Sequence, residues 1–219
     1  MGPILALDTA TDAPGVALRH DGRTSVRAIG WRAAFRETVP AAAALLAEAD
    51  LTLDDLEGIV VPAGPGSFTG LRVGATLAVA LARVRGIPLH AVPTLEAVAA
   101  ACAPAGAVRV CAVLDARRGR WYAARCERDG AGWRSLEDPR DLAPDAVAVL
   151  AAGATIVGMS LERLAPAIPA GLDIAPVPAS PDPAPVAQAL TALVALAPSA
   201  YRLAAPAELR ILYARSGVD

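Results

Sequence analysis

One stretch, residues 58–74, constrains the fold most, because it joins an apolar strand to a helix through a turn of glycine and proline. It reads Gly-Ile-Val-Val-Pro-Ala-Gly-Pro-Gly-Ser-Phe-Thr-Gly-Leu-Arg-Val-Gly. Gly64 and Gly66 let the backbone turn sharply and expose N–H groups. Ser67 or Thr69 can cap the following helix, whose first N–H groups favour an anion. The stretch therefore fits either a phosphate cradle or a tight structural corner.

Neither of the common phosphate-binding loops matches this turn. A Walker A loop ends in Gly-Lys-Ser/Thr, and the chain contains no lysine among its 20 basic residues. The dinucleotide fingerprint has Thr69 where its third glycine belongs. Gly66, Gly70 and Gly74 instead recur every four residues, which places small residues along one helical face. We favour close backbone packing over ligand contact for these glycines.

Composition points to a globular protein with a large core. Of the 219 residues, 55% are hydrophobic and 19% are charged, and the net charge of −2 gives no support for a nucleic-acid-binding face. No charged-then-apolar leader and no apolar run of about 18 residues occurs, so neither export nor a membrane span is predicted. The odd number of cysteines, three, argues against a disulfide framework. We expect a cytoplasmic protein with reduced thiols.

Hydrophobic patterning predicts an α/β fold in two lobes, an N-terminal lobe over 1–103 and a smaller C-terminal lobe over 104–219. We expect Pro40 to be tolerated only near the start of its helix, and Thr94 to cap the helix that it begins. A proline-rich loop is expected over 176–185. The expected strands are 4–9, 15–19, 24–29, 58–61, 88–91, 108–114, 121–128, 154–159 and 173–177, and the expected helices are 37–50, 69–85, 94–102 and 185–197.

A strand–aspartate–turn–strand unit occurs twice, over 5–16 and over 110–122. Asp8, followed by Thr9, and Asp115 end the two first strands, where ligands gather in α/β folds. Each carboxylate can hold a phosphate or a metal ion through water, or it can cap its own turn. Capping is the favoured interpretation. His20 and His90 have no partner at ligand spacing, so no metal site is predicted.

Other chemistry is sparse. No Gly-x-Ser-x-Gly elbow surrounds Ser67, and the absence of lysine excludes Schiff-base chemistry. Three arginines (117, 118 and 120) lie beside Trp121 and Tyr122 in the sequence. They can contact a nucleic-acid phosphate or a nucleotide base, or they can form a solvated turn. The nearly uncharged residues 71–82 require burial on all sides, either inside the chain or against another subunit.

Two motifs carry a resemblance to a known family. They are Ile4-Leu5-Ala6-Leu7-Asp8-Thr9-Ala10-Thr11 and Gly64-Pro65-Gly66-Ser67-Phe68-Thr69-Gly70-Leu71-Arg72-Val73-Gly74. Together with Asp115-Ala116-Arg117-Arg118-Gly119 and Leu212-Tyr213-Ala214-Arg215, they make the chain similar to the bacterial TsaB (YeaZ) family. The resemblance is strongest over residues 4–126.

The resemblance implies an actin-like, Hsp70-like ATPase (ASKHA) fold with two lobes of mixed sheet flanked by helices. It implies a non-catalytic subunit of the complex that adds a threonylcarbamoyl group to N6 of adenosine 37 in tRNAs reading ANN codons. The partners implied are a catalytic TsaD-like subunit, a TsaE-like ATPase and, for the chain alone, a second copy. The resemblance implies that the chain contacts transfer RNA only through the complex. It also allows ATP or ADP to bind at the interface between subunits.

The resemblance also suggests sites. It places the partner surface on the helices over 37–49 and 69–83. Catalytic and metal-ligating residues are not expected, since residues 35–39 lack the histidines that the catalytic partner carries there. The expected interface residues are Glu37, Ala41, Leu45, Thr69, Gly70, Val73, Gly74 and Leu77. The candidate nucleotide or phosphate contacts are Asp8, Thr9, Gly64, Gly66, Ser67 and Asp115. The alternatives are a stand-alone ATPase or kinase-like enzyme and, with least support, a peptidase.

Overall fold

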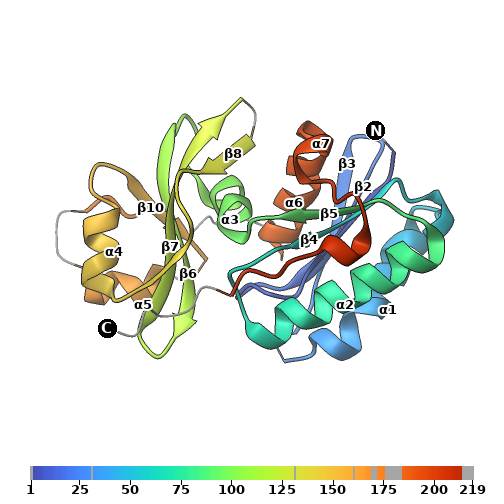
Figure 1. Cartoon of the computed structure of the whole chain (residues 1–219), viewed down its shortest axis with the longest axis horizontal. Helices are drawn as coiled ribbons and strands as arrows, with labels where there is room; N and C mark the ends of the chain where they lie inside the picture. Colours follow the sequence, from blue (N-terminus) through green and yellow to red (C-terminus); the bar gives the residue numbers. More distant parts are fainter. Residues whose placement is uncertain are drawn as a thin grey trace.

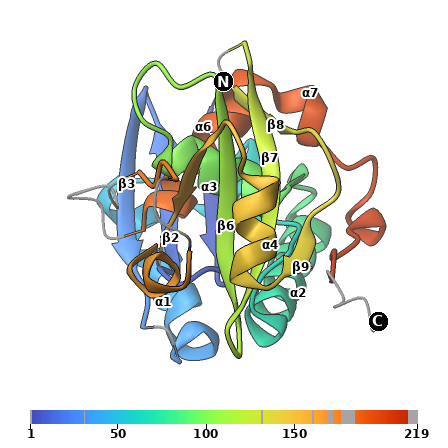
Figure 2. The same ribbon diagram turned by 90° about the vertical axis from the view of Figure 1, so that its left-hand side faces the viewer.

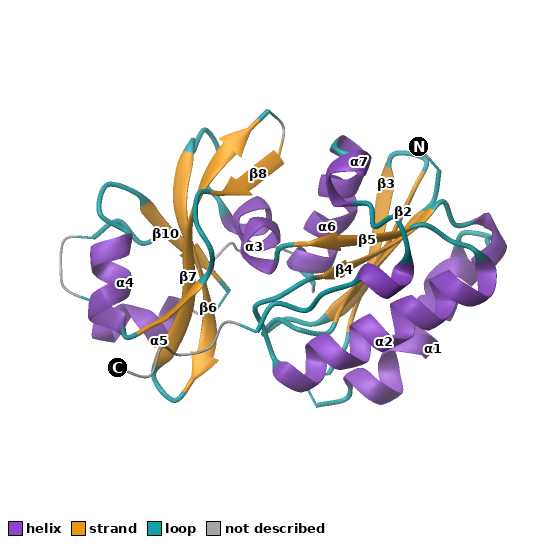
Figure 3. Ribbon diagram, in the orientation of Figure 1, coloured by secondary structure: helices purple, strands orange, loops and turns teal. Residues whose placement is uncertain are grey.

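The chain folds into two sheets that alternate with three layers of helices (Figures 1 and 3). The computed structural model describes residues 2–30, 32–130, 132–159, 161–168, 172–175 and 184–213. Helices α1 (Ala34–Glu48) and α2 (Phe68–Arg85) cover the outer face of the first sheet, and α4 (Pro144–Leu150) and α5 (Leu161–Leu164) cover that of the second. Between the sheets lie α3 (Thr94–Cys102) and α6 (Pro185–Leu196).

The first sheet has the order β3-β2-β1-β4-β5. Its antiparallel part joins β1 to β2 and β2 to β3, and its parallel part joins β1 to β4 and β4 to β5. Every residue of the central β1 and β4 is buried, as expected of strands covered on both faces. The five strands are β1 (Ile4–Asp8), β2 (Gly15–His20), β3 (Arg23–Ala28), β4 (Gly58–Pro62) and β5 (Leu89–Val92).

The second sheet repeats this mixed pattern on a smaller scale, with the order β10-β6-β7-β8 and with β9 also paired to β7. Strand β10 runs parallel to β6, and the other pairs are antiparallel. Figure 2 looks onto this sheet from the side of α4, which packs over β7. The strands are β6 (Arg109–Arg117), β7 (Arg120–Asp129), β8 (Gly132–Ser135), β9 (Arg140–Leu142) and β10 (Thr155–Gly158).

The end of the described chain returns to the first sheet. Helix α6 packs on β1 and β2, and after α7 (Pro198–Tyr201) the N–H of Leu203 donates to the carbonyl of Leu89 at 2.9 Å. Further on, the N–H of Leu212 donates to the carbonyl of Ala63 at 2.7 Å. Residues 184–213 therefore belong with the first sheet, whereas the sequence placed everything after 104 in the second lobe.

Most predicted elements are present, and the differences have local causes. Helix α1 begins at Ala34 and keeps Pro40 in its second turn, because burial of Leu45 and Leu46 outweighs the backbone bond that proline removes. Thr94 does not cap α3; its hydroxyl accepts from the N–H of Gly64 at 3.0 Å. Residues 173–175 form only one bridge, and the rest of that predicted strand, with nearly all of the proline-rich loop, lies outside the described residues.

The glycine stripe of α2 faces the end of β1, which confirms the prediction of close packing. A Cβ on Gly66 would lie 2.9 Å from the carbonyl oxygen of Ala10, and one on Gly74 would lie 2.6 Å from Oγ1 of Thr9. On Gly70 it would overlap the carbonyl oxygen of Thr9. The hydroxyl of Thr9 in turn donates to the carbonyl of Gly70 at 2.6 Å, so the strand bonds directly to the helix backbone, which carries no side chain at this contact.

We expect Gly70→Ala to lower the free energy of unfolding by about 1–3 kcal/mol, because the added methyl group forces helix and strand apart. The measurement is urea unfolding followed by circular dichroism. Thr69→Ala, at the exposed neighbouring position, is the control and should change stability by less than about 0.5 kcal/mol. Equal stability of the two variants would show that α2 does not rest on β1 through Gly70.

Candidate functional site

A cleft of about 670 Å³ opens where the ends of β1 and β6 face each other. Its walls are the β1–β2 loop, the start of α2, the β6–β7 hairpin and Tyr213. Of the candidate phosphate contacts, Gly66, Ser67 and Asp115 line this inter-sheet cleft. The other three candidates, Asp8, Thr9 and Gly64, are buried and do not line it.

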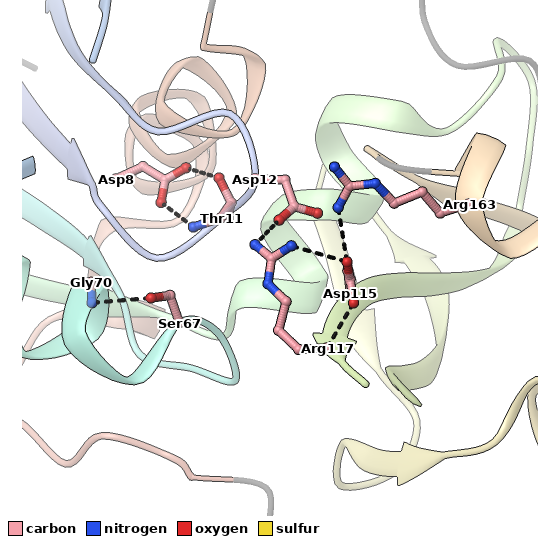
Figure 4. A network of polar contacts seen from close by, with 8 residues as sticks. All are labelled: Asp8, Thr11, Asp12, Ser67, Gly70, Asp115, Arg117 and Arg163. Carbon is pink, nitrogen blue, oxygen red and sulfur yellow. Dashed lines mark hydrogen bonds and ion pairs between the residues drawn. The ribbon is translucent and has the colours of Figure 1, made fainter. Parts of the chain in front are cut away.

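Arg117 joins the two sides of the cleft (Figure 4). Its guanidinium pairs with Asp12 of the β1–β2 loop at 2.9 Å and with Asp115 of β6 at 3.1 Å. Arg163, from α5, pairs with the same oxygen of Asp115 at 3.0 Å. The two carboxylates are nearly buried, whereas the guanidinium of Arg117 is about half-exposed. The arginine cluster seen in the sequence therefore contributes an ion pair between the lobes.

The hairpin that presents Arg117 has an unusual backbone. Arg117, Arg118 and Gly119 have φ values of 72°, 55° and 73°, which is the left-handed region in which only glycine is free of strain. A register shift between Asp115 and Arg117 adds a bulge. The turn lets the N–H of Arg117 donate to the Asp115 carboxylate at 2.7 Å, so Asp115 caps its own turn.

Asp8 also caps its own turn, as the favoured interpretation had it. It is fully buried, and its Oδ1 accepts from the N–H of Ala10 at 2.9 Å and from that of Thr11 at 3.2 Å. Its Oδ2 accepts from the hydroxyl of Thr11. Burial raises the pKa of Asp8 from 3.8 to about 6, against the lowering effect of these hydrogen bonds.

These contacts test whether the chain alone fits a magnesium-bound nucleotide, as the fold family implies. Both oxygens of Asp8 accept hydrogen bonds from the turn that follows β1 (Figure 4), and Asp8 is buried and does not line the cleft. Ser67 caps α2 by accepting from the N–H of Gly70 at 3.3 Å, which takes one of the donors that a phosphate would use. A phosphate in the cleft would also lie beside Asp12 and Asp115. The residues present do not fit such a ligand in this cleft.

A second surface lies between the outer faces of α1 and α2. We call it the α1/α2 groove; it has a volume of about 500 Å³. Phe35 stands at this groove with 84% of its surface exposed, and Val39 is more than half-exposed. A large exposed phenyl ring next to further apolar side chains is the usual sign of a protein-binding surface. The groove is lined by Ala34, Phe35, Thr38, Val39, Arg72, Val73, Thr76, Leu77 and Ala80.

Five of the eight expected interface residues are at least partly exposed, and two of them line the groove. Val73 and Leu77 line the groove, and Thr69 is exposed at the start of α2. Ala41 is half-buried, and Glu37 is exposed, although its carboxylate accepts from the N–H of Gly30 at 2.8 Å.

The structure differs for the other three. Leu45 is 1% exposed in the core beneath α1, and Gly70 and Gly74 face β1. Periodicity identified the small-residue face of α2 correctly but did not show which neighbour covers it. The apolar stretch 71–82 is likewise divided: Leu71, Ala75, Ala78 and Ala82 are buried inside the chain, and the remaining apolar side chains reach the outer face.

Three residues between the cleft and the groove, Phe68, Arg72 and Tyr213, contact one another, and no contact role is predicted for them from the sequence. The guanidinium of Arg72 lies 3.8 Å above the ring of Phe68, and its Nε donates to the hydroxyl of Tyr213 at 3.4 Å. The rings of Phe68 and Tyr213 are 5.3 Å apart. Arg72 lines both the cleft and the groove. Phe68 and Arg72 belong to the sequence motif over 64–74 and Tyr213 to the one over 212–215, so the cluster joins two motifs of the resemblance.

Two other kinds of site are absent from the described residues. None of their helices combines the length and the apolar character that crossing a bilayer requires. They bring no three His, Cys, Asp or Glu side chains together as metal ligands. Cys102, Cys111 and Cys126 are buried, and burial raises the pKa of each thiol to about 12, which makes them poor nucleophiles.

Comparison with known proteins decides the family. Residues 32–182, well over half of the chain, match the family model described as TsaD: tRNA N6-adenosine threonylcarbamoyltransferase. The tRNA threonylcarbamoyladenosine biosynthesis protein TsaB of Escherichia coli is 37% identical over 147 residues, which cover 66% of this chain and 64% of that protein. The chain belongs to the TsaB/YeaZ family. YeaZ from Pseudomonas aeruginosa superimposes with a TM-score of 0.81 at 28% identity, over 97% of this chain and 100% of that one.

The similarity within the TsaB/YeaZ family is uneven along the chain. TsaB of Bacillus subtilis is 38% identical over 121 residues, which cover 54% of this chain and 52% of that protein. The matched part therefore spans between half and two thirds of these two curated relatives. The structural match extends over almost the whole chain and confirms the predicted α/β fold of the actin-like ATPase type.

The buried carboxylate predicts a pH dependence. Folded Asp8 holds its proton to about pH 6 and the unfolded chain releases it near 3.8, so ionisation opposes folding between these values. The free energy of unfolding of the unmodified chain, relative to Asp8→Asn, should fall by up to about 3 kcal/mol as the pH rises from 4 to 6.5. Urea unfolding at several pH values measures it, and parallel curves for the two proteins would contradict it.

The strained hairpin predicts a difference between two neighbours. Glycine relieves the left-handed strain at either 117 or 118, but only Arg117→Gly removes the ion pairs to Asp12 and Asp115. Arg117→Gly should therefore be less stable than Arg118→Gly by about 1–2 kcal/mol. Thermal unfolding of the two variants compares them, and equal melting temperatures would show that the ion pair between the lobes contributes nothing.

Proposed function

We propose that the chain is a non-catalytic subunit of the complex that adds the threonylcarbamoyl group to N6 of adenosine 37 in tRNAs reading ANN codons. It would support and activate a TsaD-like catalytic subunit in the cytoplasm. The observation that carries the proposal is the exposed apolar groove on α1 and α2, beside a cleft that offers no fitted ligand site. The names of the E. coli and B. subtilis relatives, biosynthesis proteins for threonylcarbamoyladenosine, point to the same process.

The groove supports a scaffold role on physical grounds. Exposed Phe35 and Val39 on α1, with Val73 and Leu77 on α2, form an apolar strip along two adjacent helices. Burial of such a strip against a second helix pair excludes water from all four side chains, and large apolar side chains at the centre of an interface carry most of its binding energy. The core-facing side of both helices fixes the strip in place.

The chain's own chemistry supports an accessory role as well. Asp8 and Asp115 cap their turns, the thiols are buried, and the net charge is −2. These features favour tRNA binding through the complex rather than by the chain itself. A TsaE-like ATPase as a further partner, a homodimer of the chain alone and ATP or ADP at the boundary between subunits complete the proposal.

The alternative of a stand-alone ATPase or kinase-like enzyme rests on the same cleft and loses support from it. A phosphotransferase of this fold needs a carboxylate that faces the phosphates with its metal-bound water. Asp8, the carboxylate at the end of the first strand, is turned into its own loop. Calorimetry with magnesium-ATP and the chain alone tests it, and tight binding would favour the enzyme over the scaffold.

Phe35→Asp should weaken binding to the TsaD-like protein of the same organism by about 10- to 100-fold, because it places a charge in an interface that must lose its water. Calorimetry or light scattering after size exclusion measures binding, and mass spectrometry of tRNA nucleosides measures the modification. The matched control is Val149→Asp, on the exposed side of α4 with a similar exposure of 78%. Full modification by the partner without this chain would contradict the scaffold role.

A further inference from the structure

The outer face of α2 carries positive charge and no negative charge. The helix contains Arg72, Arg83 and Arg85 but neither aspartate nor glutamate. Arg72 and Arg83 are eleven residues apart, about three helical turns, and therefore share a face with Thr76 and Ala80 of the groove. On α1, exposed Arg36 follows Phe35 directly. Arg72 lines the groove, and Arg83 lines an adjoining hollow that shares Thr76 and Ala80 with it. We call Arg36, Arg72 and Arg83 the arginine rim.

Most acidic side chains of α1 and of the loop that follows it already have a partner, and Asp50 at the far end of α1 is the exception among them. Glu48 pairs with Arg27, and Asp54 pairs with Arg85 at 3.0 Å. Glu37, next to Arg36, accepts from the N–H of Gly30. Spare carboxylates are therefore scarce beside the groove.

The rim arginines have no carboxylate partner within the described residues. Within the described part of the chain, the Arg72 side chain bonds to the neutral hydroxyl of Tyr213 and lies over the ring of Phe68. In the cleft, by contrast, Arg117 pairs with two carboxylates. The rim is a local feature, since the whole chain carries a net charge of −2.

From this charge pattern we infer which partner the groove takes, on the basis of the function proposed above. We propose that the arginine rim selects a protein partner whose apolar helical face is flanked by carboxylates, in preference to a second copy of this chain. A second copy presents the same three arginines, so two grooves brought together place like charges at their edges. The apolar strip between the arginines favours a protein over RNA, because a phosphate backbone cannot cover Phe35 and Val39.

The chain itself can supply the acidic partner for a test. Arg36→Glu combined with Arg83→Glu keeps the apolar strip and makes the rim acidic; Arg72 stays, because it contacts Phe68 and Tyr213. Mixing this variant with the unmodified chain should give mixed dimers that are about tenfold tighter than either homodimer. Native mass spectrometry and sedimentation velocity count the species. Added salt should weaken the mixed dimer and strengthen the homodimer of the unmodified chain.

The control variant combines Arg23→Glu on β3 with Arg140→Glu on β9, which changes the net charge equally but lies away from the groove. Mixed with the unmodified chain, the control variant should form homodimers and mixed dimers in statistical proportions. Statistical mixing by the rim variant, or no mixed dimer at any concentration, would overturn the selection by charge. Binding of tRNA by the unmodified chain alone, lost in the rim variant but not in the control, would also overturn it in favour of RNA. None of these results touches the scaffold role, which the Phe35→Asp and modification assays test separately.

Discussion

The absence of side chains on the part of α2 that meets β1 is the constraint on which the rest of the structure depends. Gly66, Gly70 and Gly74 bring the helix onto the backbone of Thr9 and Ala10, and the N–H of Ser67 donates to the carbonyl of Ala10 at 2.8 Å. This contact fixes the start of α2 at the end of the central strand. The cleft and the groove both take one wall from α2, so the position of that helix sets both of them.

Beside this contact, the polar groups at the strand ends are bonded within the chain itself. The turn that approaches a phosphate in other folds is here filled by its own protein neighbours: Ser67 caps α2, and Leu212 covers Gly64. Asp8 and Asp115 serve their own loops, and Arg117 pairs with Asp12 across the opening. The polar groups of the cleft thus stabilise the fold, whereas Phe35 and Val39 are exposed on the outer face of α1.

Much of the fold could be predicted from the sequence, because strands such as β1 and β4 are uninterrupted apolar runs bounded by turns. The spacing of Gly66, Gly70 and Gly74 also predicted a close contact. The sequence did not show that β1, rather than a second subunit, makes that contact, since periodicity gives a face of a helix and not its neighbour. Strands β8 and β9 and helix α4 are short and only partly buried, so their patterns were too weak to read.

Long-range contacts set a second limit on prediction. The return of residues 184–213 to the first sheet joins segments more than 100 residues apart, which local patterning cannot reveal. At the candidate site, the types of residue were predicted and their orientations were not. Asp8 and Asp115 do end strands as expected, but only the structure shows that their hydrogen bonds are used within their own turns. The exposure of Phe35 likewise depends on where α1 begins.

The layer between the two sheets limits how this molecule can move. Helix α3 packs on the second sheet and α6 on the first, and the two helices pack on each other through faces rich in alanine. Pulling the sheets apart would expose both faces to water, which the hydrophobic effect opposes. A short slide of one helix along the other keeps both faces covered, and small side chains offer little steric resistance to it. The packing of α3 on α6 therefore permits a slight shear between the two sheets and opposes their separation.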